Sequence, residues 1–179
     1  MKSGILVVAA LAATACGSHE ETTLESTTFT ATQAQQRISE NLAAAIADLP
    51  GGVHLSKTSD NPGLSAFGKE RPVSSPCWEG SAQTTGMYYL SSSYWMSGVP
   101  AGENRAYYDA TVRAWEERGW AVEHVSAWVT TATLPDKFGL RLQDADEGDG
   151  SLSVTGMSAC VHESTIDDVV AEPETINHP

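Results

Sequence analysis

The sequence predicts an α+β fold in which two helices pack on one face of an antiparallel sheet, in the element order α-β-α-β-β-β. Two segments repeat apolar residues at the helical period, and four others are rich in β-formers or alternate apolar with polar side chains. An order that ends in three successive strands favours an antiparallel sheet with helices against it. The chain has 179 residues, of which 41% are hydrophobic, and this suits one domain with a modest core.

The first helix is predicted from Thr32, which is a capping residue, with Gln35 three positions later completing a capping box. Pro50 and the two glycines after it end the helix. Its apolar residues form one stripe at helical spacing, made of Ile38, Leu42, Ala45, Ile46 and Leu49. Glycine and proline recur over 51–76, so after a short strand at 53–55 we predict a long irregular connection. Such connections are typically either functional or mobile.

The first long strand is predicted at 87–95, where aromatic residues and β-formers are dense. A second helix follows at 103–118, with Tyr108, Val112 and Trp115 on its apolar stripe. On its polar side, the spacing predicts that Arg113 pairs with acids four residues away, Asp109 and Glu117. Gly119 then provides the left-handed residue that commonly ends a helix.

Three strands complete the predicted domain, at 121–131, 138–143 and 151–161. Asp149-Gly150 lies between the last two and is a strong signal for a hairpin. The 18 residues after Val161 are polar, acidic and interrupted by proline, so we expect a disordered acidic tail at 163–179. The folded domain is therefore predicted to span 32–162.

The N-terminus has the pattern of an export signal: Lys2 precedes eleven apolar or small residues, too few to span a bilayer, which needs about 20. Thr14-Ala15-Cys16 resembles the lipobox of bacterial lipoproteins. That resemblance implies that residues 1–15 are removed and that Cys16 becomes a diacylated N-terminus held at the outer face of the cell membrane. The alternative is an ordinary secretory signal. Residues 16–31 are rich in Ser, Thr and Glu, which is typical of a flexible tether.

Composition and motifs exclude several functions. The net charge of −13 disfavours nucleic-acid binding. Motifs typical of serine hydrolases and nucleotide-binding loops are absent, so the sequence indicates no cofactor and no enzyme class. The histidines, at positions 19, 54, 124, 162 and 178, lack the spacing of metal ligands, and a calcium loop started at Asp144 has Gly148 and Thr155 where acidic ligands are needed. We therefore predict no metal site and interpret the acidic segment 144–150 as a solvated hairpin turn; the alternative is a weak calcium site of another geometry formed by its four carboxylates.

Several segments together resemble the small, largely uncharacterised cell-envelope lipoproteins of high-GC Gram-positive bacteria. They are the signal ending in Cys16, the helix end Trp115-Glu116-Glu117-Arg118-Gly119-Trp120, the strand Phe138-Gly139-Leu140-Arg141-Leu142 and the closing Cys160-Val161. The resemblance covers about residues 1–162. It implies an exported, lipid-anchored protein and supplies no catalytic residues.

Two kinds of function fit these features. The first is a binding or accessory module, with an envelope protein, a glycan or a lipid as its ligand. Its candidate surface is the aromatic strand, where Tyr88, Tyr94 and Trp95 belong either to the core or to an exposed platform. The second is an enzyme on envelope polymers that uses paired carboxylates, for example Glu103 and Asp109. A pocket with converging carboxylates would favour the enzyme, and an exposed aromatic or apolar patch the binder.

Two cysteines remain if Cys16 carries lipid. Exported proteins rarely keep unpaired thiols. Cys77 lies just before the first long strand and Cys160 lies near the end of the last, and neighbouring ends of one sheet can bring two Cα atoms within the required separation of about 4.4–6.8 Å. We therefore predict a structural Cys77–Cys160 disulfide, worth roughly 4 kcal/mol in the chain-entropy model.

Overall fold

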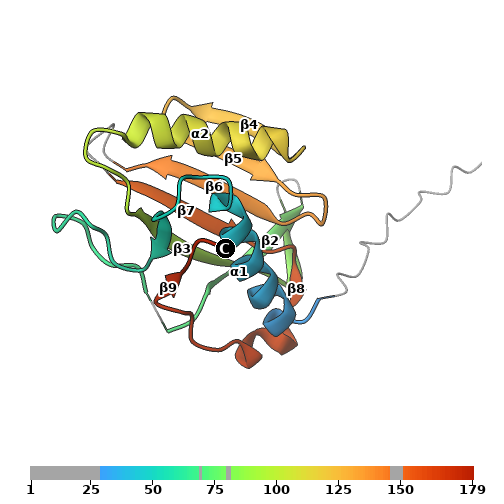
Figure 1. Cartoon of the computed structure of the whole chain (residues 1–179). Helices are drawn as coiled ribbons and strands as arrows, with labels where there is room; N and C mark the ends of the chain where they lie inside the picture. The colour runs from blue at the N-terminus through green and yellow to red at the C-terminus, as the bar shows by residue number, and fades with distance from the viewer. Residues whose placement is uncertain (1–28, 69, 80–81, 146–150) are drawn as a thin grey trace, which may run out of the picture.

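The computed structural model describes residues 29–68, 70–79, 82–145 and 151–179 (Figure 1). It is an α+β structure built on one curled antiparallel sheet, so the predicted fold class is confirmed. The elements are α1 (Ala31–Ile46), β1 (His54–Ser56), β2 (Val73–Glu79), β3 (Ala82–Ser97), α2 (Asn104–Glu117), β4 (Ala121–Ser126), β5 (Val129–Thr133), β6 (Gly139–Asp144), β7 (Leu152–Met157), β8 (Val161–His162), the 3-10 helix η1 (Glu163–Asp168) and β9 (Thr175–Ile176). The predicted order of four strands was therefore too simple.

The long strand β3 organises the sheet. The strand order is β4-β5-β6-β7-β3-β1-β9, and β2 and β8 also pair with β3. β3 extends beyond the predicted 87–95 because β2 pairs with its first half. The recurring glycines and prolines predicted an irregular connection over 51–76, but β2 begins within it, at Val73. The ladder of β2 and β3 shifts register between Pro76 and Trp78, at the kind of irregularity where a strand tolerates proline.

Two predicted strands are each split in the structure. The segment 121–131 reverses direction between β4 and β5, which then pair with each other. The segment 151–161 is interrupted between β7 and β8, where the Ser158 hydroxyl oxygen accepts a hydrogen bond from the Leu90 N–H (2.8 Å). β6 and β7 form the predicted antiparallel pair. Of the acidic connection between them, residues 146–150, including Asp149-Gly150, lie outside the described residues.

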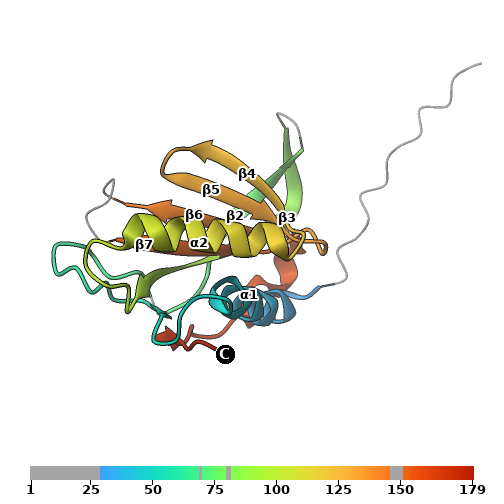
Figure 2. The ribbon, with the colours of Figure 1, turned by 45° about the horizontal axis from the view of Figure 1, so that its top comes forward.

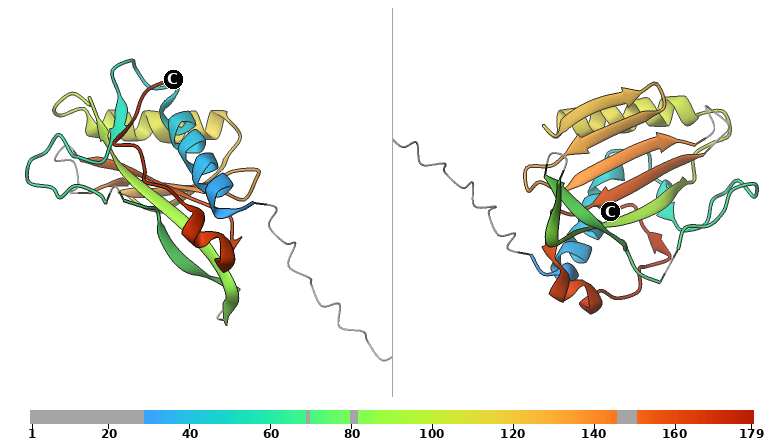
Figure 3. Two further views of the ribbon diagram at one scale, coloured as in Figure 1. Left: turned by 90° about the horizontal axis from the view of Figure 1, so that it is seen from below. Right: turned by 180° about the vertical axis from the view of Figure 1, so that it is seen from behind.

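Buried apolar residues from both long helices and from the sheet form one core, and Figure 2 shows these elements from a second direction. α1 crosses Gly156 of β7 so closely that a Cβ there would lie 2.8 Å from the Ile38 Cγ2 atom, which explains a glycine inside a strand. Trp115 of α2 is fully buried and its indole N–H donates to the Ala45 carbonyl (3.1 Å), so it joins the two helices. The hairpin of β2 and β3 projects from the opposite side of the molecule to the helices (Figure 3, left).

The first helix begins two residues earlier than predicted. Thr30, not Thr32, is its cap: the Thr30 hydroxyl oxygen accepts from the Gln33 N–H (3.3 Å), and the Gln33 side-chain oxygen accepts from the Thr30 N–H (2.9 Å). Thr32 instead donates its hydroxyl to the Asp168 carbonyl (3.0 Å). In the sequence, Thr30 and Thr32 are equivalent candidates for the cap, because each has a glutamine three residues later. In the structure, the contact of Thr32 with η1 distinguishes the two.

The predicted disorder of 163–179 is wrong. This segment forms η1 and β9, and β9 pairs with β1. Gln35 of α1 holds the connecting chain, since its side-chain nitrogen donates to the Val170 carbonyl (2.7 Å) and its side-chain oxygen accepts from the Val170 N–H (3.0 Å). Val169 and Ile176 are buried against the core. Only a few apolar residues secure the tail, too sparsely spaced to stand out in an acidic composition.

The structure contains the predicted disulfide. Cys77 of β2 and Cys160, just before β8, are bonded with a Cα separation of 6.3 Å and 83 positions apart in the chain. The bond joins two strands that both pair with β3. The predicted signal, Cys16 and most of the tether lie outside the described residues, and within the described part no helix is long and apolar enough to cross a membrane.

Candidate functional site

The aromatic strand does not form an exposed surface. Tyr94 and Trp95 expose 1% and 7% of their area, so of the two alternatives that the sequence leaves open they belong to the core and not to an exposed platform, and Tyr88 is half-buried. The irregular connection covers Trp95: Phe67 stacks on its ring with centroids 4.8 Å apart, and the indole N–H donates to the Ser65 carbonyl (3.1 Å). The cover comes from a distant segment, and strand alternation alone does not reveal it.

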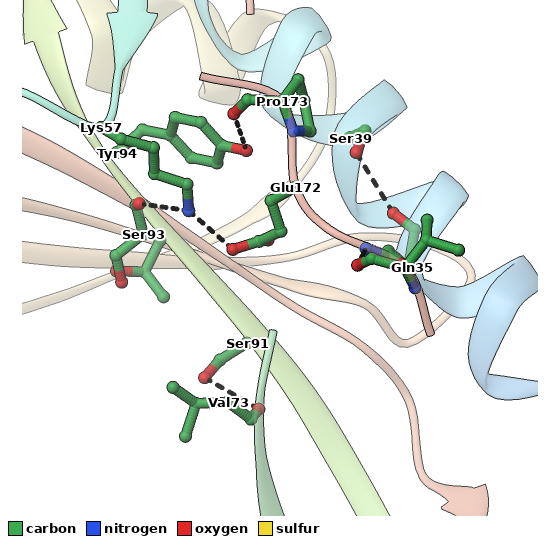
Figure 4. Close-up of polar contacts among 11 residues, drawn as sticks. Gln35, Ser39, Lys57, Val73, Ser91, Ser93, Tyr94, Glu172 and Pro173 are labelled. Atoms are coloured by element: carbon green, nitrogen blue, oxygen red, sulfur yellow. Dashed lines mark hydrogen bonds and ion pairs between the residues drawn. The ribbon is translucent and has the colours of Figure 1, made fainter. Parts of the chain in front are cut away.

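A buried ion pair lies beside Tyr94 on the helix side of the sheet (Figure 4). The Lys57 ammonium donates to the Glu172 carboxylate (2.7 Å) and to the Ser93 carbonyl (3.0 Å), and it sits 3.7 Å from the centre of the Tyr94 ring. The Tyr94 hydroxyl donates to the Pro173 carbonyl (3.1 Å). The side chains of Lys57 and Glu172 are 1% and 5% exposed. This cluster is therefore closed to solvent. It connects the C-terminal segment to β3, and its groups are not accessible to a ligand.

Burial sets the titration of this cluster. It lowers the pKa of the Lys57 ammonium, and the hydrogen bond and charge of Glu172 oppose that shift. Burial also raises the pKa of the Tyr94 phenol, and the negative charge of Glu172 raises it further. Both shifts follow from removing charge-bearing groups from water.

An open groove between α2 and β4 is the candidate functional site. Its volume is about 490 Å³. Tyr108 and Val112, both buried, lie at helical spacing along it, and His124 and Ser126 line it from β4. The charged side chains along the groove are Arg105, Asp109, Arg113 and Glu116, all from one stripe of α2. The sequence analysis placed Asp109 and Arg113 on the polar side of the helix but predicted no groove beside it.

A hydrogen-bonded chain connects the groove to the buried side of the sheet. The Thr130 hydroxyl lies 2.7 Å from the Tyr108 hydroxyl and 3.2 Å from the Nδ1 atom of His124. Thr130 is fully buried and has one proton to donate. Which of the two atoms, Thr130 Oγ1 or His124 Nδ1, donates the hydrogen bond between them depends on the tautomer of the imidazole. The exposed imidazole is thus hydrogen-bonded to a buried residue.

The charges along the groove are only partly paired. Arg105 bonds Asp109 (2.9 Å) and also donates to the Ala127 carbonyl (2.9 Å). The predicted pairs of Arg113 with Asp109 and Glu117 are absent from the described part of the chain. Within that part, the side chains of Arg113 and Glu116 make no hydrogen bond or ion pair. The groove therefore presents one available cation and one available anion.

The carboxylates named as an enzymatic pair do not converge. Asp109 lines the groove in its ion pair with Arg105, whereas Glu103 precedes α2 and does not line the groove. Across the described residues there is also no group of three His, Cys, Asp or Glu side chains that could hold a metal ion. No protein-family model, curated protein or solved structure matches the chain.

Proposed function

We propose that this protein is a lipid-anchored binding module of the cell envelope whose ligand occupies the groove between α2 and β4. The observation that carries the proposal is the pair of available charges, Arg113 and Glu116, beside the buried residues Tyr108 and Val112. Grooves that combine an apolar floor with a few placed polar groups are the usual form of small binding sites. The resemblance to envelope lipoproteins supports the location.

The packing that creates the groove supports a binding surface on the helix side. In the sheet, Gly156 pairs with Leu140, and Leu140 pairs with Ala132. Thr130 is two residues from Ala132, so its side chain lies on the same face of the sheet as Gly156. The contact of α1 at Gly156 and the contact of Tyr108 at Thr130 are therefore on one face. We infer that both helices pack on this face, as the sequence predicts. The space between α2 and the twisted hairpin of β4 and β5 then remains open.

The two available charges favour a ligand that is itself a zwitterion, such as a peptide with free ends. A carboxylate can accept two hydrogen bonds from the Arg113 guanidinium, and an ammonium can donate to Glu116. A ligand that carries only negative charge is repelled by the chain, whose net charge is −13. This repulsion disfavours the binding of simple anions, so we favour a peptide from the envelope as the ligand.

Trialanine and two blocked forms test the groove. We expect the full chain in detergent to transfer saturation to trialanine in NMR, and blocking either peptide end to weaken binding about tenfold, or about 1.4 kcal/mol. Arg113→Gln is expected to weaken trialanine but not its C-terminal amide, and Glu116→Gln to weaken trialanine but not its N-acetyl form. Arg71→Gln changes an exposed arginine outside the groove and serves as the control. Equal binding of all three peptides by every variant would exclude the groove.

Cys16 is expected to carry the lipid anchor. The wild-type protein should fractionate with membranes, and its intact mass should show a diacylglyceryl adduct at the new N-terminus. Cys16→Ala should release the protein or leave its signal uncleaved, because the thiol that receives the lipid is missing. Cys77→Ser, which removes a different cysteine, should remain in the membrane fraction. Wild-type protein found wholly soluble in the medium would contradict the anchor.

A further inference from the structure

A second hollow lies on the outer side of α1, where the helix meets the loop between β5 and β6. Its volume is about 370 Å³. The apolar part of its lining consists of Ala44 from α1, Trp120 from the turn between α2 and β4, and Leu134 and Pro135 from the loop. This recess is lined by none of the residues that line the groove between α2 and β4.

The recess contains a buried amide that the fold does not use. Asn41 lines it and is only 6% exposed. Its Nδ2 atom is buried without a hydrogen-bond partner, and its side chain makes no hydrogen bond to any residue of the described chain. Buried side-chain amides almost always have partners, and the neighbours of Asn41 on the inner side of α1 are apolar. Packing therefore gives no reason for an amide at this position.

The charged rim of the recess is already engaged. The Arg37 guanidinium donates to the Asp136 carboxylate (2.8 Å) and to the Glu40 carboxylate (3.1 Å). An incoming cation would have to displace Arg37, and an incoming anion would meet two carboxylates. Each carboxylate oxygen still has lone pairs that can accept from a hydroxyl. The rim therefore favours a neutral ligand that donates hydrogen bonds.

We propose that this recess binds a neutral sugar ring, as a second site independent of the groove. A pyranose offers a flat face of C–H groups to an aromatic side chain, here Trp120, and hydroxyls along its edge. A hydroxyl both donates and accepts, so it can pair with whichever end of the Asn41 amide faces the recess, and half a turn about the last side-chain bond brings the Nδ2 atom to that side. Glu40 and Asp136 accept from further hydroxyls. The ligand class is thus a neutral glycan.

Saturation-transfer NMR with two neutral disaccharides, maltose and N,N′-diacetylchitobiose, tests the site. The full chain is used in a detergent without a sugar head group. We expect ring protons of at least one sugar to receive saturation, and Asn41→Leu to weaken that binding at least about tenfold. Asn41→Leu is also expected to melt at the wild-type temperature or above, because it replaces an unpartnered amide by an apolar side chain of similar size. Arg113→Gln, in the groove, should bind the sugar as the wild type does.

A second variant keeps the test decisive if Asn41→Leu fails to fold. Trp120→Phe keeps an aromatic ring but removes one tryptophan, so sugar-induced changes in tryptophan fluorescence should diminish while binding persists. No saturation transfer to either sugar, or equal binding by a folded Asn41→Leu variant, would overturn the proposal. Transfer to a proline-rich peptide instead of a sugar would also overturn it and assign the recess to a protein partner.

Discussion

Glu172→Gln is expected to lower the free energy of unfolding by about 3–5 kcal/mol, because it leaves the Lys57 ammonium buried without its counter-charge. The Ser93 carbonyl and the Tyr94 ring remain as contacts, but neither carries a full negative charge. Lys57→Met should cost a similar amount, since it leaves the carboxylate buried instead. Urea denaturation followed by circular dichroism measures both effects.

The double variant Lys57→Met/Glu172→Leu distinguishes the pair from simple packing. We expect it to be more stable than either single variant and close to the wild type, because two charges are removed together and desolvation no longer opposes folding. Arg105→Met/Asp109→Leu is the matched control on an exposed pair, for which single changes should cost at most about 1 kcal/mol. Single variants at Lys57 and Glu172 that cost as little as this exposed control would show that the pair is hydrated.

The buried lysine also gives stability a defined pH dependence. Since burial lowers the pKa of Lys57 in the folded state, the unfolded chain holds more protons between that pKa and the ordinary value of 10.5. The free energy of unfolding contributed by Lys57 therefore rises with pH through this interval and is lost as pH falls below it. Tyr94 acts oppositely above its ordinary pKa of 10.0, because its pKa is raised in the folded state. Comparison of the wild type with Tyr94→Phe separates the two groups.

Loss of the Cys77–Cys160 disulfide is expected to lower the free energy of unfolding by about 4 kcal/mol, since the bond closes a loop whose ends are 83 positions apart. Such a loss is a large part of the roughly 5–15 kcal/mol that stabilises a typical domain. Cys77→Ser and Cys160→Ser should lower the melting temperature by similar amounts, because each removes the same cross-link.

Reduced wild-type protein is the control for the cysteine variants, and it should match both of them. Thiol labelling of the denatured, unreduced protein should find no free thiol at Cys77 or Cys160. Clearly unequal effects of the two serine substitutions would show that one cysteine has a role besides the cross-link.

Local patterns account for the parts of the fold that the sequence predicted. The two long helices lie where apolar residues recur at helical spacing, and β6 and β7 pair as their alternating residues indicate. The disulfide followed from the number of cysteines expected to remain after export. Each of these inferences requires only the spacing of neighbouring residues or the number of cysteines. Strand reversals without a strong turn signal, such as that between β4 and β5, were missed for the same reason.

The tertiary structure alone decided what is buried and what is open. Lys57 is one lysine among glycines and prolines in the sequence, yet Glu172, 115 positions later, makes it part of the interior. The same acidic tail that composition marks as disordered becomes ordered because Gln35, β1 and the core supply its partners. The groove and the recess exist because α2, β4, α1 and the loop after β5 meet in space. Burial depends on contacts between distant segments, and local spacing carries no information about which segments will meet.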